Sequence, residues 1–274
     1  MKLLTLNTHS WQEADNASCL LYTASAIEAE QPDVIALQEV NQREQGVIAS
    51  PGRLASSGYV DGGFPIEEKN WALLLAERLR EDGHPYSWSW SFSHVGYRTW
   101  AEGVALLSKS PIQAVRCADV SAPSLPADSW RRRRILAIHN EMGWFGSAHM
   151  GWWNDEADPF QGQWERLNAF TKTLGVPCYL MGDFNCPAHV RQEGYDLMLS
   201  SGWQDCYARA EEKDCGVTVP GQIDGWRSQQ VDGFRLDLCL AAQTGRTARS
   251  RVIFNGDFYP SVSDHFGVLT EEIL

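Results

Sequence analysis

The sequence lacks any apolar run that approaches the roughly 20 residues needed for a membrane-spanning helix. The N-terminal segment MKLLTLNTHSW becomes polar at Asn7, which is too early for the apolar core of a signal peptide. The seven cysteines form no Cys-x-x-Cys pair, so neither a zinc site nor a disulfide framework is indicated. These absences predict a protein of the reducing cytoplasm.

Basic side chains are also scarce, with 23 lysines and arginines against 35 acidic residues and a formal net charge of −12. A protein that grips duplex DNA usually presents a basic face, because binding is driven largely by counterion release. The basic cluster Arg131–Arg134 would be split by the alternation of a strand, which leaves one arginine pointing inward. The charge therefore disfavours a polynucleotide substrate without excluding one.

The composition is otherwise that of a globular protein, with 274 residues of which 43% are hydrophobic and 21% charged. No repeat, low-complexity tract or linker divides the chain, so we expect one domain spanning residues 1–274. The 12 tryptophans are unusual. Most belong in the core, and the flat rings of the others are suited to stacking on a sugar or a base in a ligand cleft.

Helical signals are few but clearly bounded. The expected helices span residues 16–27, 70–83, 158–175 and 195–199. Asn16 is expected to cap the first, with Leu21 on its buried face. Asp158 is expected to cap the third, with Pro159 at its first position. Residues 50–67 are expected to form a long loop.

Short apolar runs that are typical of strands outnumber the helices. They occur at residues 2–6, 34–37, 86–92, 104–107, 112–115, 135–138, 144–148, 178–181, 236–240, 252–254 and 266–269. Many strands with a few interspersed helices predict an α/β sandwich, in which sheets pack face to face with helices outside.

Several of these strands end in, or adjoin, a polar residue that is able to do chemistry. The residues concerned are Asn7, Glu39, His149, Asp183 with Asn185, and Asp264 with His265. Ligand sites in layered α/β folds gather at strand ends, where loops bring distant residues together. Asparagine and aspartate are also common in turns and caps, but that explanation does not account for the whole set.

The oxygen-bearing side chains in this set indicate a metal. Asn7, Glu39 and Asp264 are hard ligands that suit Mg²⁺ or Mn²⁺ and suit zinc poorly. A divalent ion of this kind, together with a carboxylate for water and imidazoles for phosphate charge, is what metal-assisted hydrolysis of a phosphate ester requires.

The remaining side chains provide those other parts. Asp183 is able to orient or deprotonate a water, and the Asn185 amide is able to hold that water or the phosphate. His149 and His265 are able to donate to phosphate oxygens or to move protons near neutral pH. The residues by themselves leave the leaving group open.

The order of these motifs resembles that of the endonuclease/exonuclease/phosphatase superfamily, which has the deoxyribonuclease-I-like fold. The resemblance runs from residue 7 to beyond 265 and rests on Asn7, Leu37-Gln38-Glu39, Gly103–Ser108, Ser147-Ala148-His149, Gly182-Asp183-Phe184-Asn185, Arg235-Leu236-Asp237 and Ser263-Asp264-His265. It implies a four-layer α/β sandwich of two mainly antiparallel sheets flanked by helices, with a Mg²⁺-dependent phosphoesterase site at one end.

The resemblance also assigns roles. It implies that Asn7 and Glu39 hold the metal, with Asp264 beside the metal and the water. It implies that Asp183 activates the water, that Asn185 and His149 contact the phosphate, and that His265 acts as an acid or base or stabilises the phosphate. Each histidine needs a partner that fixes its tautomer, and the candidates are Glu102 and Asp237.

Other segments resemble a bacterial branch of the family that includes maltose 6'-phosphate phosphatases. They are 6–11, 149–153 and 223–226. In these segments Trp152, Trp153 and Trp226 are candidates for stacking on a sugar, with core packing beneath a loop as the alternative. Tyr97 lies too far upstream to match the tyrosine of abasic-site nucleases.

The expected function is that of a cytoplasmic phosphatase acting on a small sugar phosphate. The alternatives are a nuclease or phosphodiesterase acting on nucleic acid or lipid head groups, and a silent binding module. A binding module has no need of the complete set of metal, water and imidazole residues, which argues against the last alternative. No membrane insertion and no obligate protein partner are expected.

Overall fold

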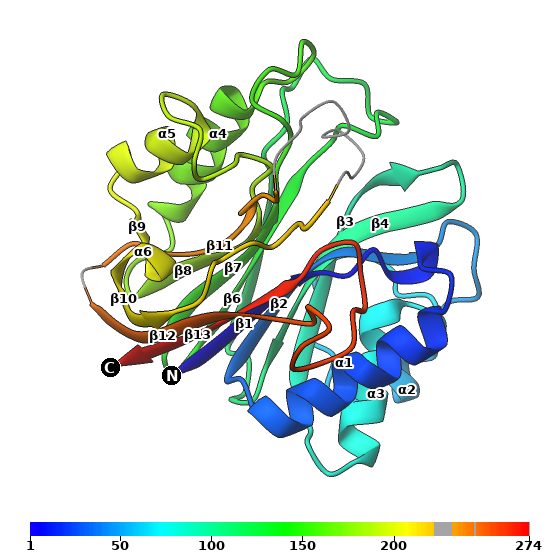
Figure 1. The fold of residues 1–274 in the computed structure, drawn as a ribbon. Helices are drawn as coiled ribbons and strands as arrows, with labels where there is room; N and C mark the ends of the chain where they lie inside the picture. The colour runs from blue at the N-terminus through cyan, green and yellow to red at the C-terminus, as the bar shows by residue number, and fades with distance from the viewer. Residues whose placement is uncertain (222–231, 244, 274) are drawn as a thin grey trace.

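The computed structural model describes residues 1–221, 232–243 and 245–273, and it shows two β-sheets packed face to face with helices outside both (Figure 1). The strands are β1 (Lys2–Asn7), β2 (Val34–Arg43), β3 (Ser87–Gly96), β4 (Trp100–Ser108), β5 (Ala114–Asp119), β6 (Arg134–Asn140), β7 (Gly143–His149), β8 (Cys178–Asp183), β9 (Gln204–Asp205), β10 (Ala210–Lys213), β11 (Asp237–Ala241), β12 (Arg246–Ile253) and β13 (Gly267–Ile273). The helices are the 3-10 turn η1 (Ser10–Gln12), α1 (Asn16–Glu30), α2 (Pro51–Ser57), α3 (Trp71–Glu81), α4 (Phe160–Thr171), α5 (Gly194–Ser200) and α6 (Cys206–Arg209).

The two sheets have different strand orders. The 7-stranded sheet runs β10-β12-β13-β1-β2-β4-β3, and the 6-stranded sheet runs β5-β6-β7-β8-β11-β9. Most neighbouring strands are antiparallel, whereas β1 with β2, β7 with β8 and β10 with β12 are parallel. Both the expected sandwich and its mainly antiparallel sheets are therefore confirmed.

The side-chain alternation along β2 explains the layers. Val34 and Ala36 belong to an apolar cluster between the sheets, where they pack with residues of β6, β7 and β8. Ile35 and Leu37 point the other way, into a second cluster that includes residues of α1 and α3. Because successive strand residues face opposite sides, one buried strand serves two cores.

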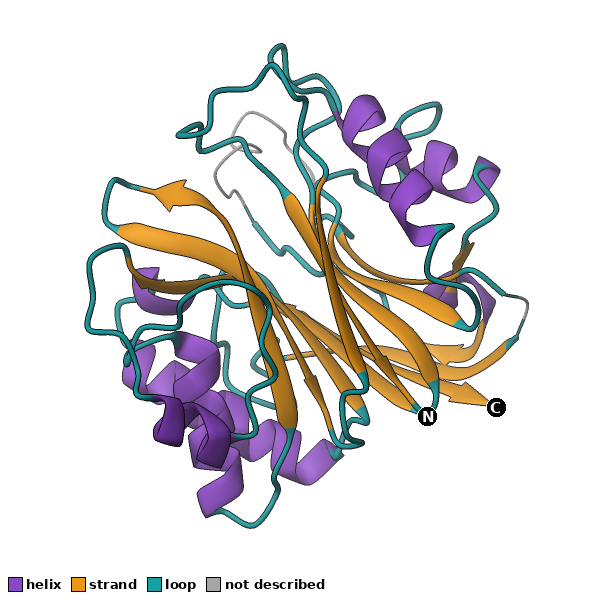
Figure 2. Ribbon diagram, turned by 180° about the vertical axis from the view of Figure 1, so that it is seen from behind, coloured by secondary structure: helices purple, strands orange, loops and turns teal. Residues whose placement is uncertain are grey.

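The 6-stranded sheet repeats this arrangement on its own outer face. Ile135 and Ala137 of β6 pack in a third cluster with Trp164 and Leu167 of α4 and with residues of α5. Figure 2 shows the resulting order of layers, with one group of helices on each side of the paired sheets. The architecture is a four-layer α/β sandwich.

The parallel pairs decide where the polar strand ends meet. The register pairs Asn7 of β1 with Gln38 of β2, and His149 of β7 with Asp183 of β8. Each pair places polar side chains side by side at one end of its sheet, at the carboxyl ends of β1, β7 and β8 and within β2, which continues to Arg43. The sheets contact each other through β2 with β7 and through β1 with β8, which brings both polar edges to the same end of the sandwich.

Residues 50–67 were expected to form a loop, and the structure corrects this by placing the short helix α2 there. Ser50 caps it by accepting a hydrogen bond from the Arg53 amide, Pro51 occupies its first turn, and Gly58 ends it at φ 84°. The helix is too short to show an apolar period, so only its capping residues identify it.

The expected start of α1 is also wrong by one residue. Asp15, rather than Asn16, is the cap, because its carboxylate accepts a hydrogen bond from the Ser18 amide. The buried face runs through Ala24 and Ile27, and Leu21 lies outside it with 45% of its surface exposed.

The start of α4 is corrected in the same way. Pro159 is the capping residue, and no side chain caps the helix. The carboxylate of Asp158 instead accepts hydrogen bonds from Gln163 and Arg166 within the same helix. None of the helices in the described ranges combines the length and apolar character that a bilayer-spanning helix requires.

Candidate active site

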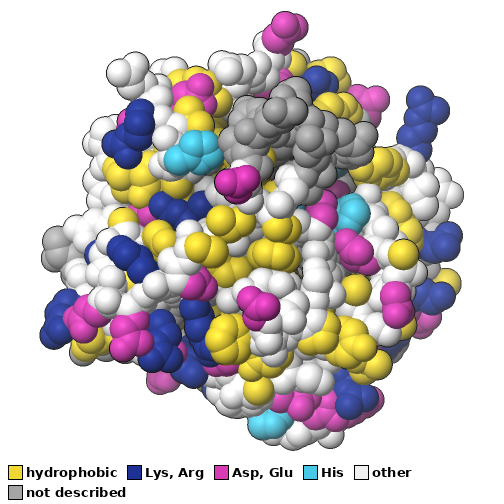
Figure 3. All heavy atoms as spheres, in the orientation of Figure 1, with side chains coloured by type: hydrophobic (Ala, Val, Ile, Leu, Met, Phe, Trp, Pro, Cys, Tyr) yellow, Lys and Arg dark blue, Asp and Glu magenta, His cyan; other side chains and the backbone are white. Residues whose placement is uncertain are grey.

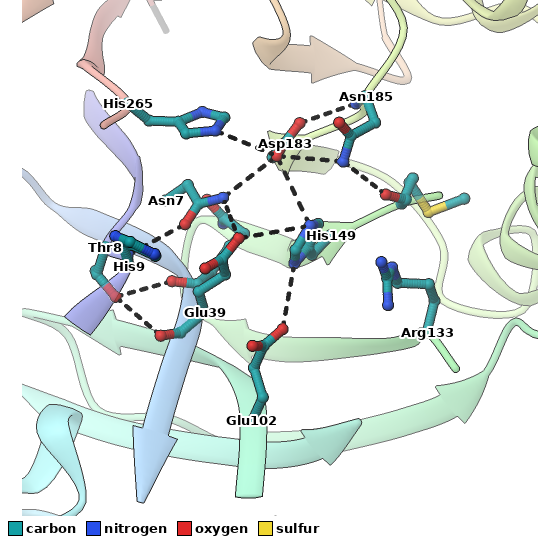
Figure 4. Close-up of polar contacts among 12 residues, drawn as sticks. Asn7, Thr8, His9, Glu39, Glu102, Arg133, His149, Asp183, Asn185 and His265 are labelled. Carbon is teal, nitrogen blue, oxygen red and sulfur yellow. Dashed lines mark hydrogen bonds and ion pairs between the residues drawn. The ribbon is translucent and has the colours of Figure 1, made fainter. Parts of the chain in front are cut away.

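Figure 4 shows that six of the residues expected from the sequence to carry chemistry lie close to one another: Asn7, Glu39, His149, Asp183, Asn185 and His265. The Asn7 side-chain amide, at the end of β1, donates to Glu39 Oε1 at 3.0 Å and to Asp183 Oδ2 at 3.3 Å. His149 Nε2, at the end of β7, lies 4.0 Å from Glu39 Oε1 and 3.7 Å from Asp183 Oδ2. Residues from both sheets therefore form a single polar cluster.

A pair of hydrogen bonds ties the two sheets together beneath this cluster. Gln38 Nε2 donates to Ser147 Oγ at 3.0 Å, and Ser147 Oγ donates to the Leu37 carbonyl at 2.9 Å. All these groups are buried. The bonds fix β2 relative to β7 one or two residues before Glu39 and His149.

An irregularity in β2 aims Glu39 into the site. The register between β2 and β4 shifts between Leu37 and Val40, and Glu39 adopts the left-handed conformation at φ 50°. A bulge of this kind re-aims a side chain and is common beside active sites. The Thr8 hydroxyl donates to the Gln38 carbonyl at 2.9 Å and stabilises the turned backbone.

Asp183 lies at the centre of the cluster and is almost fully buried. The preceding Gly182 has φ 149° and lies against β7, where an added Cβ atom would stand 1.9 Å from the Ala148 carbonyl oxygen. Only glycine fits there. The Asn185 backbone amide donates to Asp183 Oδ1 at 2.8 Å, and its side-chain amide donates to the Met150 carbonyl at 3.0 Å.

Burial and neighbouring charges act on the Asp183 carboxyl in opposite directions. Burial is the largest effect and raises its pKa, the charge of His265 opposes this, and the nearby Asp237 and Glu39 carboxylates raise it further, to about 7. A buried carboxylate that is able to exchange a proton near neutral pH is suited to the role of a general base.

His265 is held by a carboxylate from another strand. Its Nδ1 lies 2.9 Å from Asp237 Oδ2, and its Nε2 faces Asp183 Oδ2 at 3.8 Å. Burial lowers the pKa of His265, but the Asp237 and Asp183 carboxylates outweigh it and raise the pKa to about 10. The pairing of Asp237 with this histidine fixes the ring as the sequence hypothesis requires.

His149 faces Glu102, the other proposed partner, at a longer distance. Its Nδ1 lies 3.9 Å from Glu102 Oε1, which is outside hydrogen-bonding range. Burial, followed by the charges of Arg133, His94 and His265, lowers the pKa of His149 far below its usual value. Burial and the charge of Glu39 raise the pKa of Glu102 to about 8.

Asp264 lies on the rim of the cluster, with 39% of its side chain exposed. Its Oδ1 is 4.0 Å from His9 Nδ1, and that ring nitrogen also contacts Glu13 at 2.8 Å. The charges of Asp264 and Glu39 both raise the pKa of His9 against the effect of burial. Ligand atoms of His9, Glu13 and Asp264 lie within 4.8 Å of one another.

The three proposed metal ligands offer donors that fit a hard divalent ion. The Glu39 and Asp264 carboxylates both act on His9, and the Asn7 Oδ1 atom accepts a hydrogen bond only from the His9 backbone amide among the described residues. Carboxylate and amide oxygens in a strongly acidic cluster suit Mg²⁺ or Mn²⁺.

The tryptophans proposed to contact a sugar are half-buried rather than free. Trp152 packs against a small cluster of Val219, Phe234 and Leu236. Trp153 packs in the cluster beneath α4, with its ring centroid 6.3 Å from that of Phe160. Trp226 lies outside the described residues.

Two further residues near the site were not identified individually from the sequence. Arg133 is the inward arginine of the basic cluster, but it precedes β6 instead of lying in a surface strand. His94 of β3 is buried, and its Nε2 lies 3.4 Å from Glu102 Oε1. Trp88, Trp90 and Phe92 pack on the helix side of β3, and the register shift between Phe92 and His94 turns His94 toward Glu102 instead, so the alternation in the sequence does not predict its position.

The fold and the site together define a phosphoesterase with the deoxyribonuclease-I-like architecture. The model of the Endonuclease/Exonuclease/phosphatase family matches residues 4–265, and the chain belongs to that family. Each of the activities in the family's name breaks a phosphate ester bond. Comparison with curated protein sequences gives no significant match.

Several solved structures are similar along the entire chain. An endonuclease/exonuclease/phosphatase family protein from Leptotrichia buccalis is 32% identical, with a TM-score of 0.86 and 100% of both chains covered. A mannosyl-6-phosphatase from Bacteroides thetaiotaomicron is 16% identical, with a TM-score of 0.67 and 100% of both chains covered. A 3' phosphatase from Neisseria, solved with a product DNA hairpin, is 20% identical, with a TM-score of 0.65 and 100% of both chains covered. The last two likenesses show the shared fold alone.

Proposed function

We propose that this protein is a Mg²⁺- or Mn²⁺-dependent phosphatase that hydrolyses a small sugar phosphate by attack of water. The observation that carries the proposal is the position of Asp183, whose carboxylate lies within 4 Å of His149, His265 and Asn7. A water or a phosphate oxygen placed among these groups would meet a base and several hydrogen-bond donors at once.

Asn7, Glu39 and Asp264 would hold the ion. When bound, it would supply positive charge beside the phosphate and favour ionisation of a water. The chain supplies the rest of the chemistry. Asp183 would orient the water and accept its proton, and the backbone amide of Asn185 holds Asp183 Oδ1 at 2.8 Å in the required orientation.

The two imidazoles would act on the phosphoryl group. His265, fixed by Asp237 at 2.9 Å, presents its Nε2 to the centre of the site and would donate a hydrogen bond to a phosphoryl oxygen. His149 would contact a second oxygen, with Glu102 setting its tautomer once the site tightens around a substrate. These donors would stabilise the charge that develops during the displacement.

The preference for a small substrate rests on charge. The chain carries −12, and on the face in Figure 3 the described acidic and basic side chains are interspersed instead of forming a continuous basic track. Such a surface repels a polyanion at low salt, whereas a small ester enters a site whose ion supplies local positive charge. The exposed parts of Trp152 and Trp153 would contact the sugar, and Trp226 is proposed from the sequence alone.

The second candidate is a nuclease or phosphodiesterase. The similarity in fold to the Neisseria 3' phosphatase with its DNA hairpin favours nucleic acid over lipid head groups among the alternatives.

The seven free cysteines support placing the protein in a reducing compartment such as the cytoplasm.

A substrate panel at low salt tests the proposal. Disaccharide phosphates, supercoiled plasmid and an abasic duplex would be compared side by side with Mg²⁺ present, because any DNA binding is strongest at low salt. Efficient hydrolysis of the sugar phosphates with little plasmid nicking supports the phosphatase. Efficient cutting of DNA with the sugar phosphates untouched establishes the nuclease instead.

A further inference from the structure

Arg133 is a buried cation at the edge of the catalytic cluster. Only 4% of its surface is exposed, and Figure 4 shows its side chain extending toward His149 and Asn185. Its charge acts on the carboxylates of Glu102, Glu39 and Asp183 and lowers the pKa of His149. None of the roles assigned above uses it.

The neighbouring arginines all have partners that explain them. Arg131 Nε contacts Asp155 Oδ2 at 2.8 Å, and Arg132 forms an ion pair with Asp119. The guanidinium of Arg134 stacks over the ring of Phe64, 5.0 Å from its centroid. These three are half-buried, and they are accounted for by structure alone.

Arg133 differs because it is buried and has, among the described residues, neither a carboxylate within 4 Å nor an aromatic ring beneath its guanidinium. Its Nη1 donates to the Trp130 and Arg132 carbonyls at 3.0 and 3.1 Å, and these bonds fix the guanidinium plane. Its Nε is buried without a partner, and both hydrogen bonds from the guanidinium to described residues come from Nη1. A buried cation with unsatisfied donors is costly, so an anionic ligand is the natural partner for it.

The free Nε–Nη2 edge has the right chemistry for phosphate. Its two N–H groups point in the same direction with a spacing that matches two oxygens of a phosphoryl group. At neutral pH a phosphomonoester is close to a dianion, because its second pKa is about 6, whereas a diester carries one charge. A fixed cation in a poorly solvated site attracts the dianion more strongly.

We propose that Arg133 binds the phosphoryl group of the substrate and selects monoesters over diesters. The proposal rests on the phosphatase function argued above. Its competitor is a purely structural role, in which Arg133 offsets the negative charge of the cluster. The two roles predict different results when Arg133 is replaced. A structural role lowers the rates for monoesters and diesters equally, whereas selection by charge changes the ratio of the monoester rate to the diester rate.

The test compares p-nitrophenyl phosphate with bis(p-nitrophenyl) phosphate, which share a leaving group. Arg133→Met should lower kcat/KM for the monoester by about 100-fold and for the diester by less than about tenfold, the scale expected for losing one charged donor. Arg133→Lys should keep part of the monoester rate, because lysine provides the positive charge but not the two parallel N–H donors of the guanidinium. Arg134→Met, the adjacent arginine on Phe64, is the matched control and should behave as the wild type.

Calorimetric titration with inorganic phosphate provides a readout that needs no turnover. The wild type and Arg134→Met should bind phosphate equally, and Arg133→Met should bind at least about tenfold more weakly. Arg133→Gln, which keeps a donor for the Trp130 carbonyl, replaces the methionine variant should that variant fail to fold. Equal losses for monoester and diester, or unchanged phosphate binding, would leave Arg133 with a structural role. If the wild type hydrolyses neither ester, the proposed function fails, and the titration alone decides the role of Arg133.

Discussion

Gln38 and Ser147, which are 109 residues apart in the chain, are joined by a buried hydrogen bond of 3.0 Å between the two sheets. Gln38 directly precedes Glu39 of the polar cluster, and Ser147 lies two residues before His149. The Ser147 hydroxyl accepts this bond and donates its only O–H hydrogen to the Leu37 carbonyl. The site is therefore built on a polar connection between β2 and β7.

Ser147→Ala should lower the free energy of unfolding by about 1–3 kcal/mol, because it leaves the Gln38 amide buried without its acceptor. Urea denaturation measures this. Ser56→Ala, at an exposed position of α2, should change the stability by less than about 0.5 kcal/mol. If Ser147→Ala also lowers the stability by less than about 0.5 kcal/mol, the cross-sheet bond contributes little.

Removal of metal should abolish activity, since the proposed ligands are oxygen donors in an acidic cluster. EDTA should eliminate hydrolysis, and Mg²⁺ or Mn²⁺ should restore it. Glu39→Gln should shift the metal concentration needed for activity upward while the thermal unfolding temperature of the metal-free protein stays nearly constant, because the change removes charge but little volume. Glu44→Gln, exposed just beyond the same strand, is the control. Full turnover in rigorously metal-free protein contradicts the prediction.

Asp183→Asn and His265→Ala should each lower kcat by at least about 100-fold, the scale of a lost base or charge-stabilising group. The double variant should lose much less than the product of the two effects, because both groups act on one centre and lie 3.8 Å apart. Steady-state kinetics provide the measurement, and Asp257→Asn, exposed in a turn, provides the control. Turnover near the wild-type rate in either single variant would overturn the assigned role.

The carboxylate of Glu30, the last residue of α1, is expected to make the stability of the fold depend on pH in the acidic range. Its carboxylate accepts from the Tyr259 hydroxyl at 2.8 Å and lies 2.5 Å from Arg251 Nη2. Burial opposes ionisation, but these bonds and the charges of Arg251 and Lys2 outweigh it, so the pKa of Glu30 is lowered. A lowered pKa in the folded state contributes stability above the unfolded value, about 4.3, and that contribution is lost as the pH falls through the folded value.

Glu30→Gln should therefore destabilise the protein by about 1.5–3 kcal/mol near pH 7, and the difference from the wild type should shrink below about pH 4.3. Urea denaturation across pH 3–7 measures it. Glu81→Gln, exposed at the end of α3, should show no such pH dependence. A difference that stays constant with pH would mean that the Glu30 charge does not contribute.

Trp152→Ala and Trp153→Ala should raise KM for a disaccharide phosphate more than they lower kcat, because the rings would contact the sugar and not the reacting phosphate. Trp144→Ala is the matched control, since Trp144 is half-buried at the opposite end of β7 from His149. A change in kcat alone, or equal effects in all three variants, indicates that the rings serve only packing.

The sequence predicted most of the elements, because their periods are local, and it proposed the residues of the site. Strand and helix periods identified most of the elements, and the polar residue at the end of each apolar run identified the residues that meet in the cluster. The failures were local as well: α2 is too short to have a period, and the caps depend on whether a side chain reaches a backbone amide, as Asp15 does and Asp158 does not.

The tertiary structure alone decided which groups act on one another. Asp237 belongs to His265 at 2.9 Å, whereas Glu102 stays 3.9 Å from His149 and also faces His94. Arg133 is exceptional among four consecutive arginines because it is buried and no described residue offers it a carboxylate or an aromatic ring. Such pairings depend on how two sheets are registered against each other, and electrostatic interactions depend on distance and burial that no linear spacing specifies.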